Sequence, residues 1–210
     1  MTRKQKVLEI QKIFDVVYKD AKCSLDYNEP HELLIAVMLS AQCTDARVNM
    51  VTPKLFERYK TCEDFKYADI DELMELIKSC GFYKTKAKNI ISACTDITDM
   101  YGGVIPNSMD KLLKLAGVGR KTANLILGDY YNVPGLVIDT HAIRLTNRIG
   151  LTKYKEPEKI EYDLSKIVPD DYKIRFCHQL VYHGRAICNA RSPKCEKCPV
   201  KHLCKFGHNK

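Results

Sequence analysis

The chain has 210 residues, with 34 lysines and arginines against 26 aspartates and glutamates and a formal net charge of +8. This length can bury one sizeable core or two smaller ones, and the charge favours an anionic partner without specifying one. Neither an apolar signal-peptide core nor a run of about 18 apolar residues occurs, so a soluble, cytoplasmic protein with no membrane partner is expected. In such a compartment the ten cysteines are expected to be metal ligands or buried thiols, because disulfides are rare there.

Apolar residues recur at helical spacing along nearly the whole chain. Sets at i, i+3, i+4 and i+7 predict amphipathic helices, and no alternating strand pattern extends beyond a few residues. The predicted helical segments are residues 10–17, 34–41, 73–80, 87–101, 109–116, 123–130, 160–168 and 177–184. The sequence therefore predicts an all-α fold.

The segments 109–116 and 123–130 are joined by Gly117-Val118-Gly119, which predicts a tight helical hairpin. Gly117 allows the left-handed conformation that ends a helix, and Gly119 can begin the next one without a side chain in the way. The second helix then opens with bare backbone N–H groups. Together with adjacent cations, such groups form a site for an anion, most often phosphate.

Three residues near this turn are candidates for chemistry. Arg120 and Lys121 follow it directly, and Asp139 lies eighteen residues after Lys121. Each has a plain alternative, since a lysine in the first turn of a helix is usually a solvated charge and Asp139 can simply cap the helix that follows it.

Four cysteines near the C-terminus give the strongest spacing signal. Cys188, Cys195, Cys198 and Cys204 form the pattern C-x6-C-x2-C-x5-C. Four thiolates in a short loop bind metal, either as a tetrahedral zinc site or as a [4Fe–4S] cluster. The spacing matches neither common ferredoxin pattern, so the spacing alone favours zinc slightly. The other six cysteines are interpreted as buried thiols.

The segment Leu-Ala-Gly-Val-Gly-Arg-Lys-Thr-Ala (115–123), followed by Val-Ile-Asp-Thr-His (137–141), resembles the helix-hairpin-helix signature of the endonuclease III family. The resemblance covers nearly the whole chain. It implies two helical domains flanking a DNA-binding cleft. Residues 22–132 would form a helical barrel ending in the hairpin, and residues 1–21 with 133–210 an iron–sulfur cluster domain.

The resemblance also changes how the cysteine pattern is interpreted. His183-Gly184-Arg185 followed by this cysteine spacing implies a [4Fe–4S] cluster held by Cys188, Cys195, Cys198 and Cys204. Four protein ligands leave no open coordination position, so the expected role of the cluster is structural.

Two further loops resemble DNA-contacting segments of the family. Gln42 stands where a glutamine enters the gap left by a flipped base, although the residues alone indicate only a helix cap at Thr44 or Asp45. Phe82 stands where the family carries an apolar wedge, usually leucine; its alternative is a core anchor between two helices. Lys84, Lys86 and Lys88 are interpreted as phosphate contacts or a solvated face.

The family implies a bifunctional DNA glycosylase that removes oxidised pyrimidines from double-stranded DNA and cleaves abasic sites. Lys121 would attack C1′ and form a Schiff base, an electron sink that permits β-elimination of the 3′ phosphate. Its amine must first lose a proton, which partial burial and the charge of Arg120 would favour. Asp139 would stabilise the sugar cation and accept a proton, and the damaged base has to be flipped out of the duplex.

Three alternatives remain open. The first is an adenine-removing relative, which would have a longer, two-part chain and a carboxylate where this chain has Ala36. The second is a relative that removes the base without cutting the strand, and such relatives lack the lysine that is present here as Lys121. The third is a non-catalytic helix-hairpin-helix DNA-binding module with a zinc knuckle. The protein is expected to be a monomer.

Overall fold

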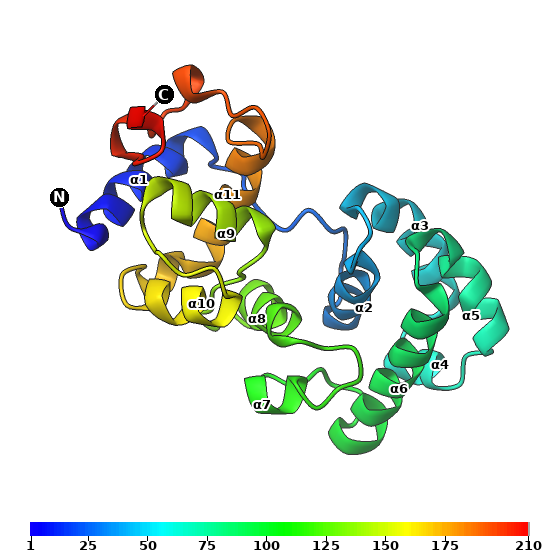
Figure 1. The fold of residues 1–210 in the computed structure, drawn as a ribbon. Coiled ribbons are helices and arrows are strands. Elements are labelled where there is room, and N and C mark those ends of the chain that lie inside the picture. Colours follow the sequence, from blue (N-terminus) through cyan, green and yellow to red (C-terminus); the bar gives the residue numbers. More distant parts are fainter. Residues whose placement is uncertain (210) are drawn as a thin grey trace. The chain divides into compact units, whose positions relative to one another are not determined.

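The computed structural model describes residues 1–209, which contain helices and turns and no strand (Figure 1). The predicted all-α fold is confirmed. None of the helices in this described part is long and apolar enough to cross a bilayer. The α-helices are α1 (Arg3–Val17), α2 (Pro30–Ser40), α3 (Asp45–Arg58), α4 (Cys62–Lys66), α5 (Ile70–Ile77), α6 (Tyr83–Tyr101), α7 (Met109–Leu112), α8 (Arg120–Asp129), α9 (Thr140–Ile149), α10 (Pro157–Ser165) and α11 (Lys173–Ala186). The 3₁₀ turns are η1 (Lys78–Cys80), η2 (Asp170–Tyr172), η3 (Cys195–Lys197), η4 (Lys201–Leu203) and η5 (Gly207–Asn209).

The chain folds into two compact units. The central unit is Cys23–Tyr131, and the terminal unit combines Met1–Lys22 with the chain from Asn132 onward. The two chain ends therefore share one unit, and the central unit is a single continuous segment.

The terminal unit is held together by contacts between α1 and the C-terminal third of the chain. Phe14 of α1 is completely buried. Arg3 forms an ion pair with Asp163 of α10 (Nη1–Oδ2, 2.8 Å) and also donates to the Leu151 carbonyl at 2.9 Å. In Figure 1, α1 (blue) lies beside the C-terminal turns (red). The first helix therefore belongs to the same compact unit as the C-terminal third of the chain.

The central unit is built around α2. Every residue from Leu33 to Leu39 is buried, and a helix that is apolar on all sides belongs in a core. Helices α3, α6 and α8 all contact α2. Ala36, in the middle of α2, is fully buried in this core.

The first helix of the predicted hairpin is shorter than expected. The apolar spacing predicts a helix over 109–116, but α7 ends at Leu112. Beyond it, the N–H groups of Lys114 and Leu115 donate to carbonyls three residues back, at 3.2 and 3.1 Å. This tighter turn leads the chain into Gly117. Leu115 remains buried, so its apolar character reflects packing in a turn and not a helix face.

Candidate functional site

The turn before α8 contains two glycines, and the fold requires only the first of them. Gly117 has a φ of +75°, and a Cβ there would lie 2.9 Å from Asn89 Nδ2 and 3.1 Å from Met38 Cε. Both the backbone conformation and the packing therefore require glycine at 117. Gly119 is extended, with φ −96° and ψ 175°, and a Cβ there would meet nothing within 4 Å. The packing of the protein does not require glycine at 119. The absence of a side chain at this position leaves the outer face of the turn open.

Helix α8 begins at Arg120, and its N-cap residue, Gly119, provides no side-chain cap. Its first N–H groups consequently lack the partner that most helix starts receive. Val118 is buried, whereas Arg120 and Lys121 are exposed beside these groups. The partial burial expected for Lys121 is not found. The local arrangement is an uncapped helix N-terminus with two exposed basic side chains beside it, which suits an anion.

Asp139 is the N-cap of α9, in the terminal unit. Its Oδ1 accepts a hydrogen bond from the Ala142 backbone N–H at 2.7 Å. The side chain is half-buried, and the preceding residue, Ile138, is buried. The capping interpretation is therefore correct. The cap fixes the orientation of the carboxylate and uses only one of its two oxygens.

Gln42 and Phe82 both have left-handed backbones, with φ of 54° and 47°. This conformation costs an L-residue about 1–2 kcal/mol, so the surrounding structure must hold each residue in place. The side chain of Phe82 is 65% exposed, and the prediction of a core anchor is therefore wrong. Thr44 caps α3 by accepting from the Arg47 N–H at 3.2 Å, as the residues alone indicate.

Of the three lysines around the start of α6, Lys84 and Lys88 are exposed, but Lys86 is only 6% exposed. Its Nζ donates to the carbonyls of Leu39 and Cys80, both at 2.7 Å. The interpretation of Lys86 as a phosphate contact or part of a solvated face is wrong. Burial lowers the pKa of Lys86.

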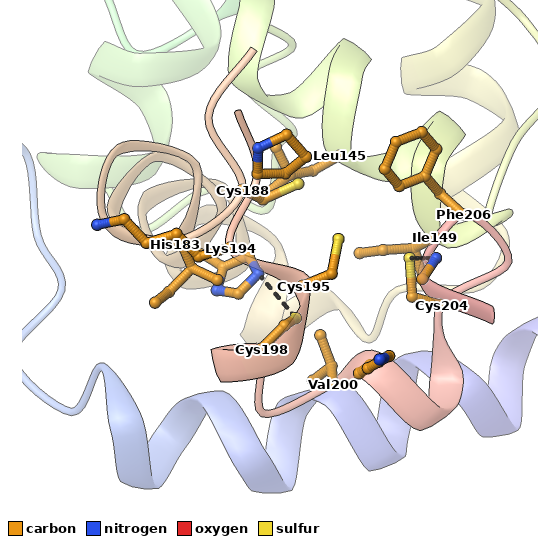
Figure 2. A pocket seen from close by; sticks show the side chains of 14 residues that line it. Leu145, Ile149, His183, Cys188, Lys194, Cys195, Cys198, Val200, Cys204 and Phe206 are labelled. Atoms are coloured by element: carbon orange, nitrogen blue, oxygen red, sulfur yellow. Dashed lines mark hydrogen bonds between the residues drawn. The ribbon is translucent and has the colours of Figure 1, made fainter. Parts of the chain in front are cut away.

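The four C-terminal cysteines line one cavity in the terminal unit, and Figure 2 shows their thiols standing around a common space. In residues 1–209 no three His, Cys, Asp or Glu side chains are grouped tightly enough for a single ion. All four thiols line the same cavity, an arrangement that suits a group bound by all of them. Apolar side chains complete the wall, namely Leu145, Ile149, Val200 and Phe206. Soft thiolate ligands in an apolar wall fit a [4Fe–4S] cluster.

Hydrogen-bond donors from outside the cysteine pattern reach three of these sulfurs. The Nη1 of Arg148 lies 3.3 Å from Cys188 Sγ, and the Gly207 N–H lies 3.4 Å from Cys204 Sγ. Arg148 also donates to the Asn189 carbonyl at 2.8 Å, which ties the loop after Cys188 to α9. Donors of this kind stabilise thiolate charge and orient the ligands.

The third donor is His183, which is 1% exposed. Its Nδ1 lies 2.7 Å from the Tyr18 hydroxyl, and its Nε2 lies 3.5 Å from Cys198 Sγ. Burial lowers the pKa of His183 to about 4, so the ring is neutral. A thiolate that ligates the cluster can only accept, so the single proton of the neutral ring lies on Nε2 and faces Cys198, and Nδ1 accepts from the Tyr18 hydroxyl. Burial and the nearby thiols raise the pKa of Tyr18 to about 12, so this phenol stays protonated. Sequence reasoning identified neither Tyr18 nor Arg148, because nothing in the local spacing links them to the cysteines.

An uncapped helix-hairpin-helix turn and a four-thiol cavity are the features of a helix-hairpin-helix DNA-binding protein that holds a metal centre. A family model described as "HhH-GPD superfamily base excision DNA repair protein" matches residues 35–170. A second, described as "Iron-sulfur binding domain of endonuclease III", matches residues 188–204. The chain belongs to the endonuclease III family.

The relatives match over nearly the full length. Endonuclease III of Synechocystis sp. is 48% identical, over 97% of this chain and 93% of the relative. Two solved structures, "Structure of a non-covalent Endonuclease III-DNA Complex" and "Structure of a Trapped Endonuclease III-DNA Covalent Intermediate: Estranged-Adenine Complex", each have a TM-score of 0.93 and 41% identity. They cover 100% of this chain and 98% and 99% of their own chains. The protein is a DNA glycosylase and abasic-site lyase with a [4Fe–4S] cluster, and its partner is DNA.

The cluster assignment predicts the metal content. The purified protein should be brown and contain about four iron and four sulfide per chain. Cys195→Ala should lose the iron and yield less folded protein, because the ligand set is then incomplete. Cys23→Ala, which changes a thiol of the central unit, should keep both iron and yield. Iron and sulfide analysis with visible absorbance measures this, and full iron content in Cys195→Ala would contradict the ligand assignment.

The two glycines of the hairpin turn should separate stability from binding. Gly117→Ala should lower the free energy of unfolding by at least about 1 kcal/mol, because alanine is strained at positive φ. Gly119→Ala should leave stability unchanged or slightly raised, and should weaken binding to damaged and undamaged duplexes alike. Thermal unfolding and fluorescence anisotropy measure the two effects. Wild-type affinity in Gly119→Ala would show that the open face of the turn does not meet DNA.

Proposed function

We propose that Lys121 is the nucleophile and Asp139 the assisting carboxylate in the removal of oxidised pyrimidines from double-stranded DNA and in the cleavage of the resulting abasic site. The observation that carries this assignment is the exposed Lys121 amine in the first turn of an uncapped helix. A DNA phosphate bound by the free N–H groups of that turn would bring the sugar of a neighbouring nucleotide to this amine. One similar structure is a trapped covalent intermediate of endonuclease III with DNA, which supports a covalent route.

The proposed chemistry has two stages. First, the Lys121 amine forms a bond to C1′ while the C1′–N bond to the base breaks, and the base leaves with the bonding electrons and takes up a proton. The sugar ring then opens to an imine between Lys121 and C1′. Second, a proton leaves C2′, and its electrons form a double bond as the C3′–O bond to the phosphate breaks. Water finally hydrolyses the imine and releases the lysine.

Asp139 is proposed to act through the carboxylate oxygen that does not cap α9. The Oδ1 cap to Ala142 fixes the carboxylate plane, so Oδ2 has a defined direction. A negative oxygen so held can stabilise the positive charge that develops on the sugar, and can accept a proton from the attacking amine. Because the carboxylate is pre-oriented by its own helix, little reorganisation is needed during the reaction.

Gln42 and Phe82 are proposed to enter the DNA helix around the flipped nucleotide. The base cannot be reached inside the duplex, and an extruded base leaves a gap that other groups must fill. Phe82 has an apolar ring that is 65% exposed on a fixed left-handed backbone, as a wedge between base steps requires. Gln42 has amide donors and acceptors that can pair with the base left without a partner.

The central unit would be the helical barrel domain and the terminal unit the iron–sulfur domain, with the chain acting as a monomer. The substrate would be duplex DNA with a damaged base or an abasic site. We also propose a cytoplasmic location with the DNA, where a reducing environment keeps the cysteine thiols available for the cluster.

Borohydride trapping tests the nucleophile. Wild-type protein, an abasic-site duplex and borohydride should give a covalent adduct, because only an imine is reduced to a stable amine. Lys121→Gln should abolish both the adduct and strand cleavage while DNA binding is largely kept. The matched control is Lys114→Gln, which changes an exposed lysine before the turn and should still be trapped. An adduct formed by Lys121→Gln would mean that another amine is the nucleophile.

Asp139→Asn tests the carboxylate without removing the cap, since asparagine is an equally good N-cap residue. It should slow removal of an oxidised pyrimidine by roughly 10²–10⁴-fold, the usual range for loss of a general acid or base. Trapping on a pre-formed abasic site should fall much less, because no glycosidic bond has to break. Single-turnover assays on the two substrates measure this. Equal losses on both would place Asp139 in a step shared by both substrates.

A further inference from the structure

One buried cation in the central unit has no part in the reaction described so far. Lys86 lies in the first turn of α6, on the helix face that also carries Ile90, Ala93 and Ile97, all buried. Its side chain therefore points into the protein, and only 6% of it is exposed. A buried ammonium needs hydrogen-bond acceptors around it, since burial of an unpaired charge is costly.

The acceptors of Lys86 come from the ends of two different helical segments. Nζ donates to the Leu39 carbonyl and to the Cys80 carbonyl, both at 2.7 Å. Leu39 lies in the last turn of α2, and Cys80 ends η1, directly after α5. Carbonyls at helix ends have no partner within the helix, and a lysine ammonium can donate to them and interact favourably with the helix dipole. A single ammonium thus joins the ends of two helices that are 41 residues apart in the sequence (80 − 39 = 41).

Each of these carbonyls lies just before a strained, exposed residue. Gln42 follows Leu39 by three positions, and Phe82 follows Cys80 by two. Both have left-handed backbones, with φ of 54° and 47°. A small displacement of either helix end would be passed directly to the side chain that follows it.

We infer that Lys86 is a positioning residue, which sets the distance between the Gln42 and Phe82 loops so that both side chains engage a distorted duplex together. This inference rests on the proposed role of those two residues. Lys86 itself touches no DNA in this account, and it acts through the backbone of the two loops. The ammonium is suited to this because it donates in two directions at once, which an apolar side chain of the same length cannot do.

The test compares Lys86→Met with Lys84→Met, a matched change of an exposed lysine in the same turn of α6. Binding is measured to a duplex with a stable abasic-site analogue and to the same duplex without damage. Lys86→Met should lower the preference for the abasic duplex about tenfold, which corresponds to about 1.4 kcal/mol, while affinity for the undamaged duplex stays within about twofold. Lys84→Met should lower both affinities by the same factor and leave the preference unchanged.

A spectroscopic measurement separates positioning from general stability. A fluorescent base analogue opposite the abasic site brightens when it is unstacked, and Lys86→Met should reduce this signal at saturating protein. Lys86→Arg, which can donate to both carbonyls, should restore it. Where Lys86→Met does not fold, Lys86→Gln provides the same comparison, because its shorter neutral amide cannot join both carbonyls. An unchanged preference and an unchanged signal in a folded variant would overturn the inference.

A double-mutant cycle with Phe82→Ala identifies the residue through which Lys86 acts. If Lys86 positions Phe82, then Lys86→Met should cause little further loss of preference in the Phe82→Ala background. Full additivity would overturn the inference. If neither Phe82→Ala nor Gln42→Ala changes the preference, the proposed role of the two loops fails, and this outcome is distinct from failure of the lysine's role.

Discussion

The proposed DNA-binding surface of the central unit depends on three left-handed turns. Each of these turns lies just before a helix. Gln42 precedes α3, Phe82 precedes α6 and Gly117 precedes α8. A left-handed residue reverses the backbone within one or two positions, so the chain leaves one helix and enters the next with its turn facing outward. At Gly117 the turn exposes backbone N–H groups, and at the other two positions it exposes a side chain. The same local geometry thus provides both a phosphate site and two groups that can enter a duplex.

These turns have a common support. Helices α3, α6 and α8 all contact α2, and α2 is apolar on every side. Below the hairpin turn, Met38 of α2 lies so close to Gly117 that a Cβ would come within 3.1 Å of it. A close-packed interior transmits a displacement instead of absorbing it. The spacing of the three turns is therefore set by the packing of the core. A substitution that changes the side-chain volume in α2 should affect DNA binding, although α2 itself has no proposed contact with the DNA.

How much of the site could be predicted depended on how local its signal was. The hairpin turn and the four cysteines each lie within a short segment, so their spacing alone indicated phosphate and metal. Lys86 lies between Lys84 and Lys88, and this run of charge indicated a surface. The helical period contained the opposite signal, because Lys86 is four residues before Ile90 on the buried face of α6. The position of Lys86 therefore follows the apolar period of the helix and not the run of charge around it.

The partners of the cluster ligands could not be predicted in this way, because they are distant in the sequence. Tyr18 and His183 are 165 residues apart, and only the folded terminal unit brings them to 2.7 Å. Phe14 packs against the same ring, with centroids 5.0 Å apart. The loops that carry Cys195, Cys198 and Cys204 contain only 3₁₀ turns, so little regular structure fixes them. Helix α1 supplies what these loops lack: through Tyr18 and Phe14 it holds His183, and through His183 it orients a proton toward Cys198. The N-terminal helix is thus a part of the cluster site, although its own sequence contains no metal ligand and no sign of one.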